Sequence, residues 1–331
     1  MSLFKRSSKL GKSKGEEGYG RGEASIAEGD DVLIDEDVMV EKLMQSLEAP
    51  DYQPPTLPSV AVELMGLARK SDVDMKEVVG LLEQDSMIAG RVLKLVQSPL
   101  YSGLSQINSL NDALMRVGLK TLRDVVMQIA MNMKVFRSTD YADTMELLRR
   151  HSTMTAHMAK IVCKHARIDA DGAFLAGLLH DVGIAGTLLA LSEGKGNRKT
   201  PPDLIAIWPA VDRVHTRAAE IMAGHWDLSE EIVTALAAHH QVLLQGKPHP
   251  LAACVAIADD LAHERGFGVV PKSDGSLDET KLSRTDFMSS HVNVDRSGAR
   301  TLEHARNALD LDDAAMEQIR AQAAELENPF A

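Results

Sequence analysis

The chain has 331 residues, which is enough for one large core or two domains, and a formal net charge of -12. This acidic balance argues against a general binder of nucleic acid backbones, because such proteins need concentrated positive charge. Aromatic residues make up only 4% of the chain whereas methionine occurs 16 times. That composition favours helices packed through aliphatic side chains, alanine and methionine over a β-sheet protein.

The cysteines and the apolar segments indicate the cellular setting. Cys163 and Cys254 are the only cysteines and lie in apolar helical contexts, which favours buried free thiols over a disulfide or a cysteine zinc site. The basic N-terminus lacks the apolar run of a secretory signal. The best candidate for a membrane helix, residues 173–191, is interrupted by His180 and Asp181. We therefore expect a soluble, cytoplasmic protein without a transmembrane segment.

The predicted elements begin after a polar tail. Residues 1–35 are rich in glycine, serine and charge, basic residues first and acidic residues after them, which predicts disorder. We interpret this tail as a solvated linker, although its basic part could also contact an acidic partner or a membrane surface. Residues 36–55 are expected to form a short helix, at 36–48, and a proline-rich linker.

From Pro58 onward apolar residues recur at intervals of three and four, the spacing of an amphipathic helix. Breaks at 71–74, 98–103 and Gly118 divide the first half into four or five short helices. No strand pattern and no glycine-rich phosphate loop is found. Residues 267–331 are expected to add one or two amphipathic helices as a C-terminal extension. In the second half, helices are expected at 140–166, 171–182, 185–192, 203–224, 229–240 and 250–265.

Histidines and aspartates are spread over these helices in the second half of the chain. Neutral imidazole nitrogens and carboxylate oxygens are the donors that divalent transition metals prefer. A single histidine on an apolar helix face is usually a core residue. Burying several polar groups together is unfavourable unless they have partners, and a cation would serve them all. The set therefore indicates a metal centre; its members are His151, His180, Asp181, His215, His239, His240 and Asp259.

The remaining histidines do not fit this grouping of histidines and aspartates on the apolar faces of several helices. We interpret them as surface or loop residues. They are His157, His165, His225, His249, His263, His291 and His304.

Several segments, in a fixed order, resemble the HDOD domain, the HD-related output domain of bacterial signal transduction proteins. This domain belongs to the HD superfamily of metal-dependent phosphohydrolases. The resemblance covers residues 56–266 and implies an all-α, two-lobed helical bundle. The segments are LPSVAVELMGLA, LLEQDSMIAGRVLKLVQSPLYSG, INSLNDALMRVGLKTLRDVV, FLAGLLHDVG, HWDLSEEIVTALAAHH and AIADDLA.

The resemblance also assigns roles to the metal-binding set. By position, it implies a primary metal site formed by His151, His180, Asp181 and Asp259. A second site would contain His215, His239 and His240, with Asp181 as a bridge. One or two divalent ions are expected, and the donors do not distinguish iron, manganese, zinc or nickel. In an active enzyme, His180 and Asp181 would be the candidate catalytic residues.

Two functions follow from the resemblance. The first is a regulatory output module that passes a stimulus to signalling proteins. A nucleotide second messenger could be a further partner of such a module. The second is a metal-dependent phosphohydrolase acting on a nucleotide or cyclic nucleotide. The related HD-GYP phosphodiesterases carry a lysine soon after the HD pair, where this chain has Ile184, and a GYP segment that HHQVLLQGKPHP lacks. These departures favour the regulatory module, whereas the intact ligand set favours the enzyme.

Overall fold

The computed structural model describes residues 35–101, 107–169, 171–193, 201–271, 277–278 and 297–326. Within these ranges the chain is almost entirely helical, and the all-α prediction is confirmed. The only strands there are two-residue segments in two antiparallel hairpins. The predicted N-terminal tail, apart from Asp35, lies outside the described residues. The strands are β1 (Leu243–Leu244), β2 (Lys247–Pro248), β3 (Val270–Pro271) and β4 (Leu277–Asp278).

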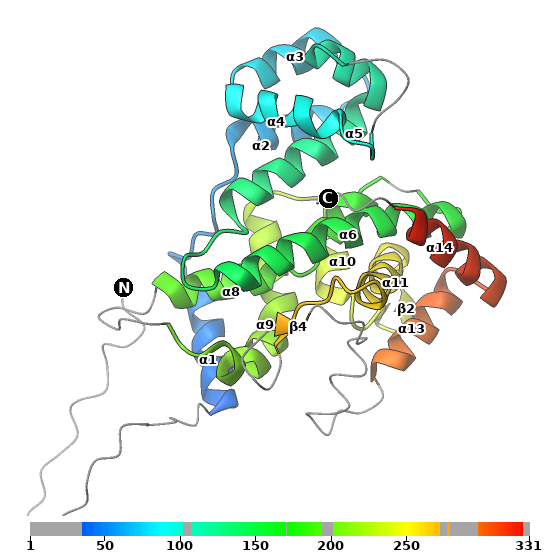
Figure 1. Ribbon diagram of the computed structural model, residues 1–331. Helices are drawn as coiled ribbons and strands as arrows, with labels where there is room; N and C mark the ends of the chain where they lie inside the picture. Colours follow the sequence, from blue (N-terminus) through cyan, green and yellow to red (C-terminus); the bar gives the residue numbers. More distant parts are fainter. Residues whose placement is uncertain are drawn as a thin grey trace, which may run out of the picture.

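The helices form two lobes (Figure 1). In the upper lobe, Asp74, Asp85 and Ser109 each precede a helix and accept a hydrogen bond from a backbone N–H of its first turn. These caps satisfy donors that the helix itself leaves unpaired. The upper lobe consists of α2 (Ser59–Ala68), α3 (Met75–Glu83), α4 (Ser86–Val96) and the first part of α5 (Leu110–Lys134).

Helix α5 connects the two lobes. It contacts α2, α3 and α4 in the upper lobe and α7 in the lower one. The break predicted at Gly118 is a kink inside this helix, where Gly118 has φ 76° and ψ 165°. Glycine reaches positive φ at little steric cost, so the chain can change direction there. Beyond the kink, Leu122 and Val126 are fully buried.

The lower lobe contains all of the predicted second-half helices. The predicted helices at 171–182 and 185–192 form one nearly continuous segment that is interrupted by a turn at His180 and Asp181. The C-terminal helices pack on this lobe, against α11 and α6. The lobe consists of α1 (Glu36–Leu47), α6 (Ala142–Ala166), α7 (Ala173–Leu179), α8 (Val182–Glu193), α9 (Leu204–His225), α10 (Glu230–Ala238), α11 (Pro250–Glu264), α13 (Ser297–Ala308) and α14 (Asp313–Glu325).

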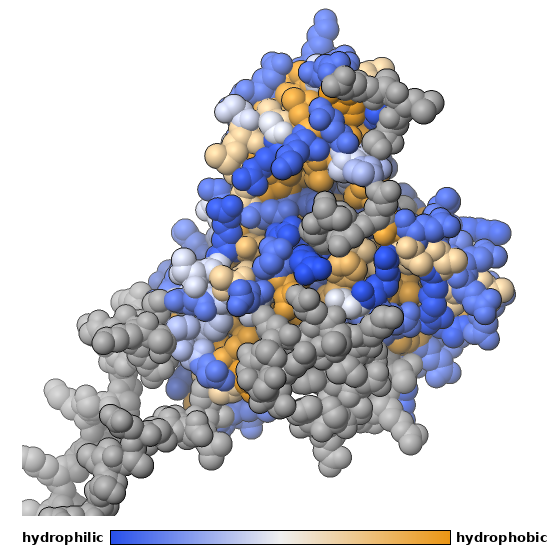
Figure 2. Space-filling model, viewed as in Figure 1, coloured by the Kyte–Doolittle hydropathy of each residue, from blue (hydrophilic) through white to orange (hydrophobic). Residues whose placement is uncertain are grey.

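The segment Ala173–Glu193, which comprises α7 and α8, lies at the centre of the lower lobe. Among the described residues it alone has the length and hydropathy of a membrane-spanning helix, but 89% of that window is buried inside the protein. Its apolar side chains are covered by α6 and α9. The face of the molecule seen in Figure 2 is mostly hydrophilic, with smaller hydrophobic areas. The segment is therefore the core helix of this fold.

Two glycines allow neighbouring helices to approach this central segment closely. A Cβ atom on Gly177 would lie 2.8 Å from the Cα of Ala156 in α6. A Cβ atom on Gly183 would overlap the carbonyl oxygen of His215 and lie 2.7 Å from the backbone nitrogen of Ala219 in α9. Backbone atoms cannot move aside as a flexible side chain can. The two glycines therefore fix the distances of α6 and α9 from the turn between α7 and α8.

Gly183→Ala is expected to destabilise the protein by about 2–3 kcal/mol, because the added methyl group must push α8 away from α9. Gly90→Ala is a matched control. Gly90 lies within exposed helical surface in α4, and a Cβ there would have no atom within 4 Å. That control should be neutral or stabilising by about 0.5–1 kcal/mol. Urea unfolding followed by circular dichroism measures both, and equal stability of the two variants would contradict the close packing.

Candidate metal centre

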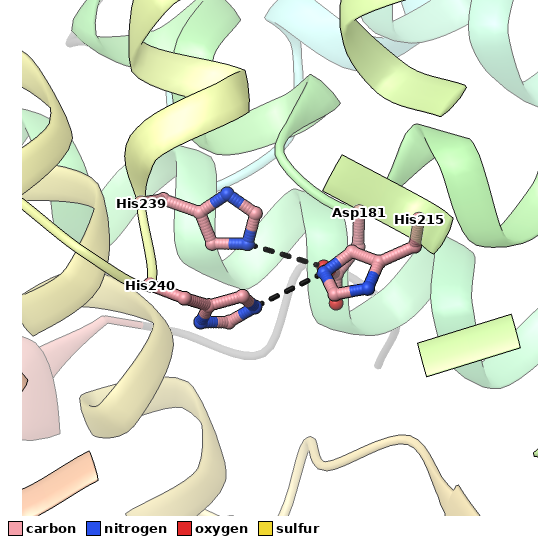
Figure 3. A group of neighbouring side chains, drawn as sticks. All are labelled: Asp181, His215, His239 and His240. Atoms are coloured by element: carbon pink, nitrogen blue, oxygen red, sulfur yellow. Dashed lines mark hydrogen bonds and ion pairs between the residues drawn. The ribbon is translucent and has the colours of Figure 1, made fainter. Parts of the chain in front are cut away.

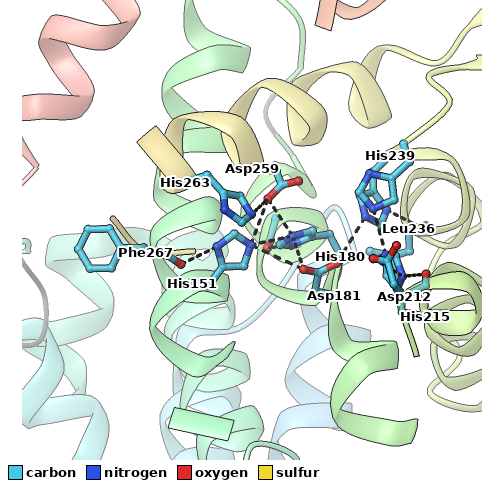
Figure 4. Close-up of polar contacts among 12 residues, drawn as sticks. His151, His180, Asp181, Asp212, His215, Leu236, His239, Asp259, His263 and Phe267 are labelled. Atoms are coloured by element: carbon cyan, nitrogen blue, oxygen red, sulfur yellow. Dashed lines mark hydrogen bonds and ion pairs between the residues drawn. The ribbon is translucent and has the colours of Figure 1, made fainter. Parts of the chain in front are cut away.

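All seven predicted ligands converge in the lower lobe (Figures 3 and 4). Six of them are buried, and His240 is partly exposed. They come from five parts of the fold, so no pair of helices could form the cluster alone. The side chains are His151 from α6, His180 and Asp181 from the turn between α7 and α8, His215 from α9, His239 and His240 after α10, and Asp259 from α11.

One group of donors surrounds His151. Its Nε2 lies 3.1 Å from the Nε2 of His180 and 3.1 Å from the Oδ1 of Asp259. The Nε2 of His180 lies 3.3 Å from the Oδ2 of Asp181. Two donors that are each about 2.1 Å from one metal ion are separated by about 3.0 Å at a right angle and about 3.4 Å at the tetrahedral angle. The observed separations therefore match donors that share an ion.

A second group consists of His215, His239 and His240, which lie around Asp181 (Figure 3). The Oδ1 of Asp181 lies 3.4 Å from the Nε2 of His215 and 3.5 Å from the Nε2 of His239. The Nε2 of His240 lies 3.0 Å from that of His215. Asp181 thus directs Oδ2 to the first group and Oδ1 to the second.

Backbone carbonyls fix the orientation of four of these imidazoles. In each of them Nδ1 lies within hydrogen-bond distance of a carbonyl oxygen, which can only accept. Nδ1 must therefore carry a proton, and the neutral ring presents the lone pair of Nε2 to the centre. This is the arrangement of metal-binding histidines in proteins. The pairs are His151 with Phe267, His180 with Gly177, His215 with Asp212 and His239 with Leu236.

These lone pairs require positive charge between them. If Nε2 of His151 and Nε2 of His180 are both unprotonated, neither can donate to the other across 3.1 Å. The Oδ1 of Asp181 and the Nε2 of His239 are buried and make no hydrogen bond. Burying such groups without compensation is unfavourable. A metal ion satisfies all of these atoms together, so the donor set fits a divalent cation.

The pKa values show the same requirement for positive charge. Burial lowers the pKa of His180, but the neighbouring carboxylates of Asp181 and Asp259 outweigh it and raise that pKa to about 10. Burial raises the pKa of Asp181, but His180, His239 and His215 together hold it well below its usual range. Without a metal, a proton on His180 therefore supplies the positive charge.

The sequence-based interpretation of His263 as a surface or loop residue is wrong. His263 is only 3% exposed, and its Nε2 lies 3.4 Å from the Oδ1 of Asp259. Its ring centroid lies 5.0 Å from that of His151. The spacing of four residues from Asp259 on one helix is a signal that could have found it, because such residues share a helix face.

The same interpretation is also wrong for His157, which is buried. Its ring centroid lies 5.1 Å from that of Phe174, and burial lowers its pKa to about 3. His157 belongs to the packing of α6 rather than to the metal centre. Of the other histidines, His225 and His304 are exposed, His165 pairs with Gln322, His249 caps α11, and His291 lies outside the described residues.

Both cysteines agree with their prediction. Cys163 and Cys254 are buried free thiols, and their Sγ atoms lie 3.0 Å apart where α6 crosses α11. They lie in the packed helix interface and are not part of the group of metal donors.

The comparisons with solved structures show the same fold in several other proteins. A candidate metal-dependent phosphohydrolase from Shewanella amazonensis SB2B superposes with a TM-score of 0.58 at 19% identity, covering 83% of this chain and 99% of that one. An HDOD domain protein of unknown function from Geobacter sulfurreducens gives 0.56 at 23%, covering 88% and 99%. A candidate signal transduction protein from Marinobacter aquaeolei VT8 gives 0.51 at 17%, covering 88% and 66%.

Sequence comparisons identify the family. An uncharacterized protein of Treponema pallidum (strain Nichols) is 26% identical over 220 residues, which are 62% of this chain. The chain spans only 41% of that relative's length. The model of the HDOD domain matches residues 55–242, which is more than half of the chain. The chain therefore belongs to the HDOD domain family.

Proposed function

We propose that this chain is a cytoplasmic output module of bacterial signal transduction that acts on protein partners and contains a two-ion metal centre. Membership of the HDOD family supports the signalling role. The observation that carries the metal centre is the carboxylate of Asp181, whose two oxygens face two separate groups of histidines. A carboxylate in that position can bridge two cations.

The ligands divide into two sets on this proposal. The first ion would be held by His151, His180 and Asp259, and the second by His215, His239 and His240, with Asp181 shared by both. The functional domain would then extend to residue 266, because α11 supplies Asp259 and packs along α6. The family match ends earlier, at residue 242.

The surroundings of the centre favour regulation over catalysis. Ile184, which occupies the position of the lysine in the HD-GYP enzymes, is only 2% exposed and packs in the core. The charged neighbours that most lower the pKa of Asp181 are histidines. Those histidines are themselves candidate ligands, so they would not be available to bind a phosphate group. A buried metal centre of this kind suits a structural or regulatory role.

A metal-dependent phosphohydrolase is the second candidate, and the bridging position of Asp181 favours it. Two divalent ions held close together would supply Lewis acidity toward the oxygens of a phosphoester. His180 and Asp181 would be the first residues to test for a catalytic role. The substrate on this alternative is a nucleotide or a cyclic nucleotide.

The metal centre can be tested by elemental analysis of the protein after loading with iron, manganese, zinc or nickel. We expect up to two equivalents in the wild type and a loss of metal in His180→Ala and Asp181→Ala. His304→Ala is the control, since His304 is an exposed histidine far along the chain in α13. Absence of metal from the loaded wild type would contradict both candidate functions.

Hydrolysis assays with the same metal-loaded protein distinguish the two candidate functions. We expect no turnover of a panel of linear and cyclic nucleotides, because the centre lacks the phosphate-binding lysine of the related enzymes. Metal-dependent hydrolysis that disappears in Asp181→Ala would instead establish the phosphohydrolase.

Proximity labelling in cells tests the signalling role. We expect the wild type to label partner proteins and Asp181→Ala to label them less strongly.

Metal binding is expected to release about one proton per protein molecule at neutral pH. The pKa of His180 is raised to about 10 in the metal-free protein, so its Nε2 is protonated there and must lose that proton to bind a metal. Affinity should therefore fall about tenfold for each pH unit below this value. Calorimetric titration in buffers of different ionisation enthalpy measures the released proton, and an identical heat in all buffers would refute the prediction.

A further inference from the structure

We infer that His263 is a positioning residue of the metal centre: the Nε2 edge of its imidazole faces the carboxylate of Asp259 and helps to hold it toward His151, without itself binding a metal. The inference rests on the proposed function, in which Asp259 is a ligand. It assigns a role to a residue of α11 that lies outside the family match.

The contact involves one oxygen of Asp259 (Figure 4). Its Oδ1 lies 3.1 Å from the Nε2 of His151 and 3.4 Å from the Nε2 of His263. At 3.4 Å the second contact is longer than an ordinary N–H to oxygen hydrogen bond, so it is an electrostatic contact between the imidazole and the carboxylate. Both imidazoles are buried, so neither can exchange this contact for water.

The two imidazoles differ at Nδ1. The Nδ1 of His151 lies 2.9 Å from the carbonyl oxygen of Phe267, which fixes a proton on Nδ1 and leaves a lone pair on Nε2. The Nδ1 of His263 is buried and makes no hydrogen bond. A proton placed there would have no acceptor, whereas a proton on Nε2 faces the carboxylate of Asp259. Nε2 of His263 is therefore the protonated nitrogen and has no lone pair for a metal.

The turn after α11 organises both imidazoles. Phe267 supplies the carbonyl for His151, and the next residue, Gly268, leaves room for His263, since a Cβ there would lie 2.6 Å from its Nδ1. The turn thus positions one imidazole that binds the metal and one that orients a ligand. Partners of this second kind commonly affect metal affinity by about 10–100-fold.

Titration with Co²⁺, followed by visible absorption, tests the role. His263→Leu removes the donor to Asp259 and is expected to weaken Co²⁺ binding by about 10–100-fold. His263→Gln keeps an amide N–H and should recover most of the affinity. Both variants should bind as many Co²⁺ ions as the wild type, with absorption bands at the same wavelengths. His304→Leu, which alters an exposed histidine, is the control.

Two results of this titration would overturn the inference. If both variants bind one ion fewer, or if their bands shift together, His263 is a metal ligand. If His263→Leu binds Co²⁺ as tightly as the wild type, the contact with Asp259 has no positioning role.

Long-range proton–nitrogen NMR spectra of the metal-free wild type, labelled with ¹⁵N-histidine, give a second test that does not need the variants to fold alike. We expect a proton on Nε2 of His263, the opposite of the Nδ1–H form in the neutral ligand histidines. A proton on Nδ1 alone would overturn the inference. A chain that shows the Nε2 proton but binds no Co²⁺ would support the contact and refute only the proposed function.

Discussion

The arrangement of the lower lobe depends on two carboxylates, Asp181 and Asp259, that are buried among imidazoles. Negative charge in a protein interior is strongly unfavourable unless a cation or a hydrogen-bond donor lies beside it. Here helices from five parts of the fold bring histidines to these carboxylates, and backbone carbonyls orient most of the rings. Binding of a cation at this cluster would consequently be linked to the packing of these helices, because each would favour the geometry that the other needs.

Close packing of the backbone sets the distances within the centre. The pair His180 and Asp181 lies in a turn between two apolar helices, with Gly177 on one side and Gly183 on the other. Each glycine allows a neighbouring helix, α6 or α9, to come within direct backbone contact. Because His151 and His215 project from those two helices, the reach of their side chains to Asp181 follows from the helix separation.

The sequence was sufficient to predict the helices and the seven converging side chains, because helical periodicity and the HD pair are local features. The family resemblance supplied the way in which distant helices meet. His263 and His157 were misassigned for one reason: α11 and α6 are covered by neighbouring elements on several sides. Most positions on these two helices are therefore buried, including those of both histidines. The spacing of four residues places His263 on the same helix face as Asp259, whereas the contact of His157 with the ring of Phe174 follows only from the tertiary arrangement.

The kink at Gly118 has a consequence for cooperativity. All seven candidate ligands come from the lower lobe, whereas the upper lobe continues into it through a helix that is kinked at Gly118. Segments separated in this way commonly open as independent units. Amide hydrogens of α2, α3 and α4 can therefore exchange with solvent through local openings of the upper lobe that leave the buried carboxylates of the lower lobe undisturbed.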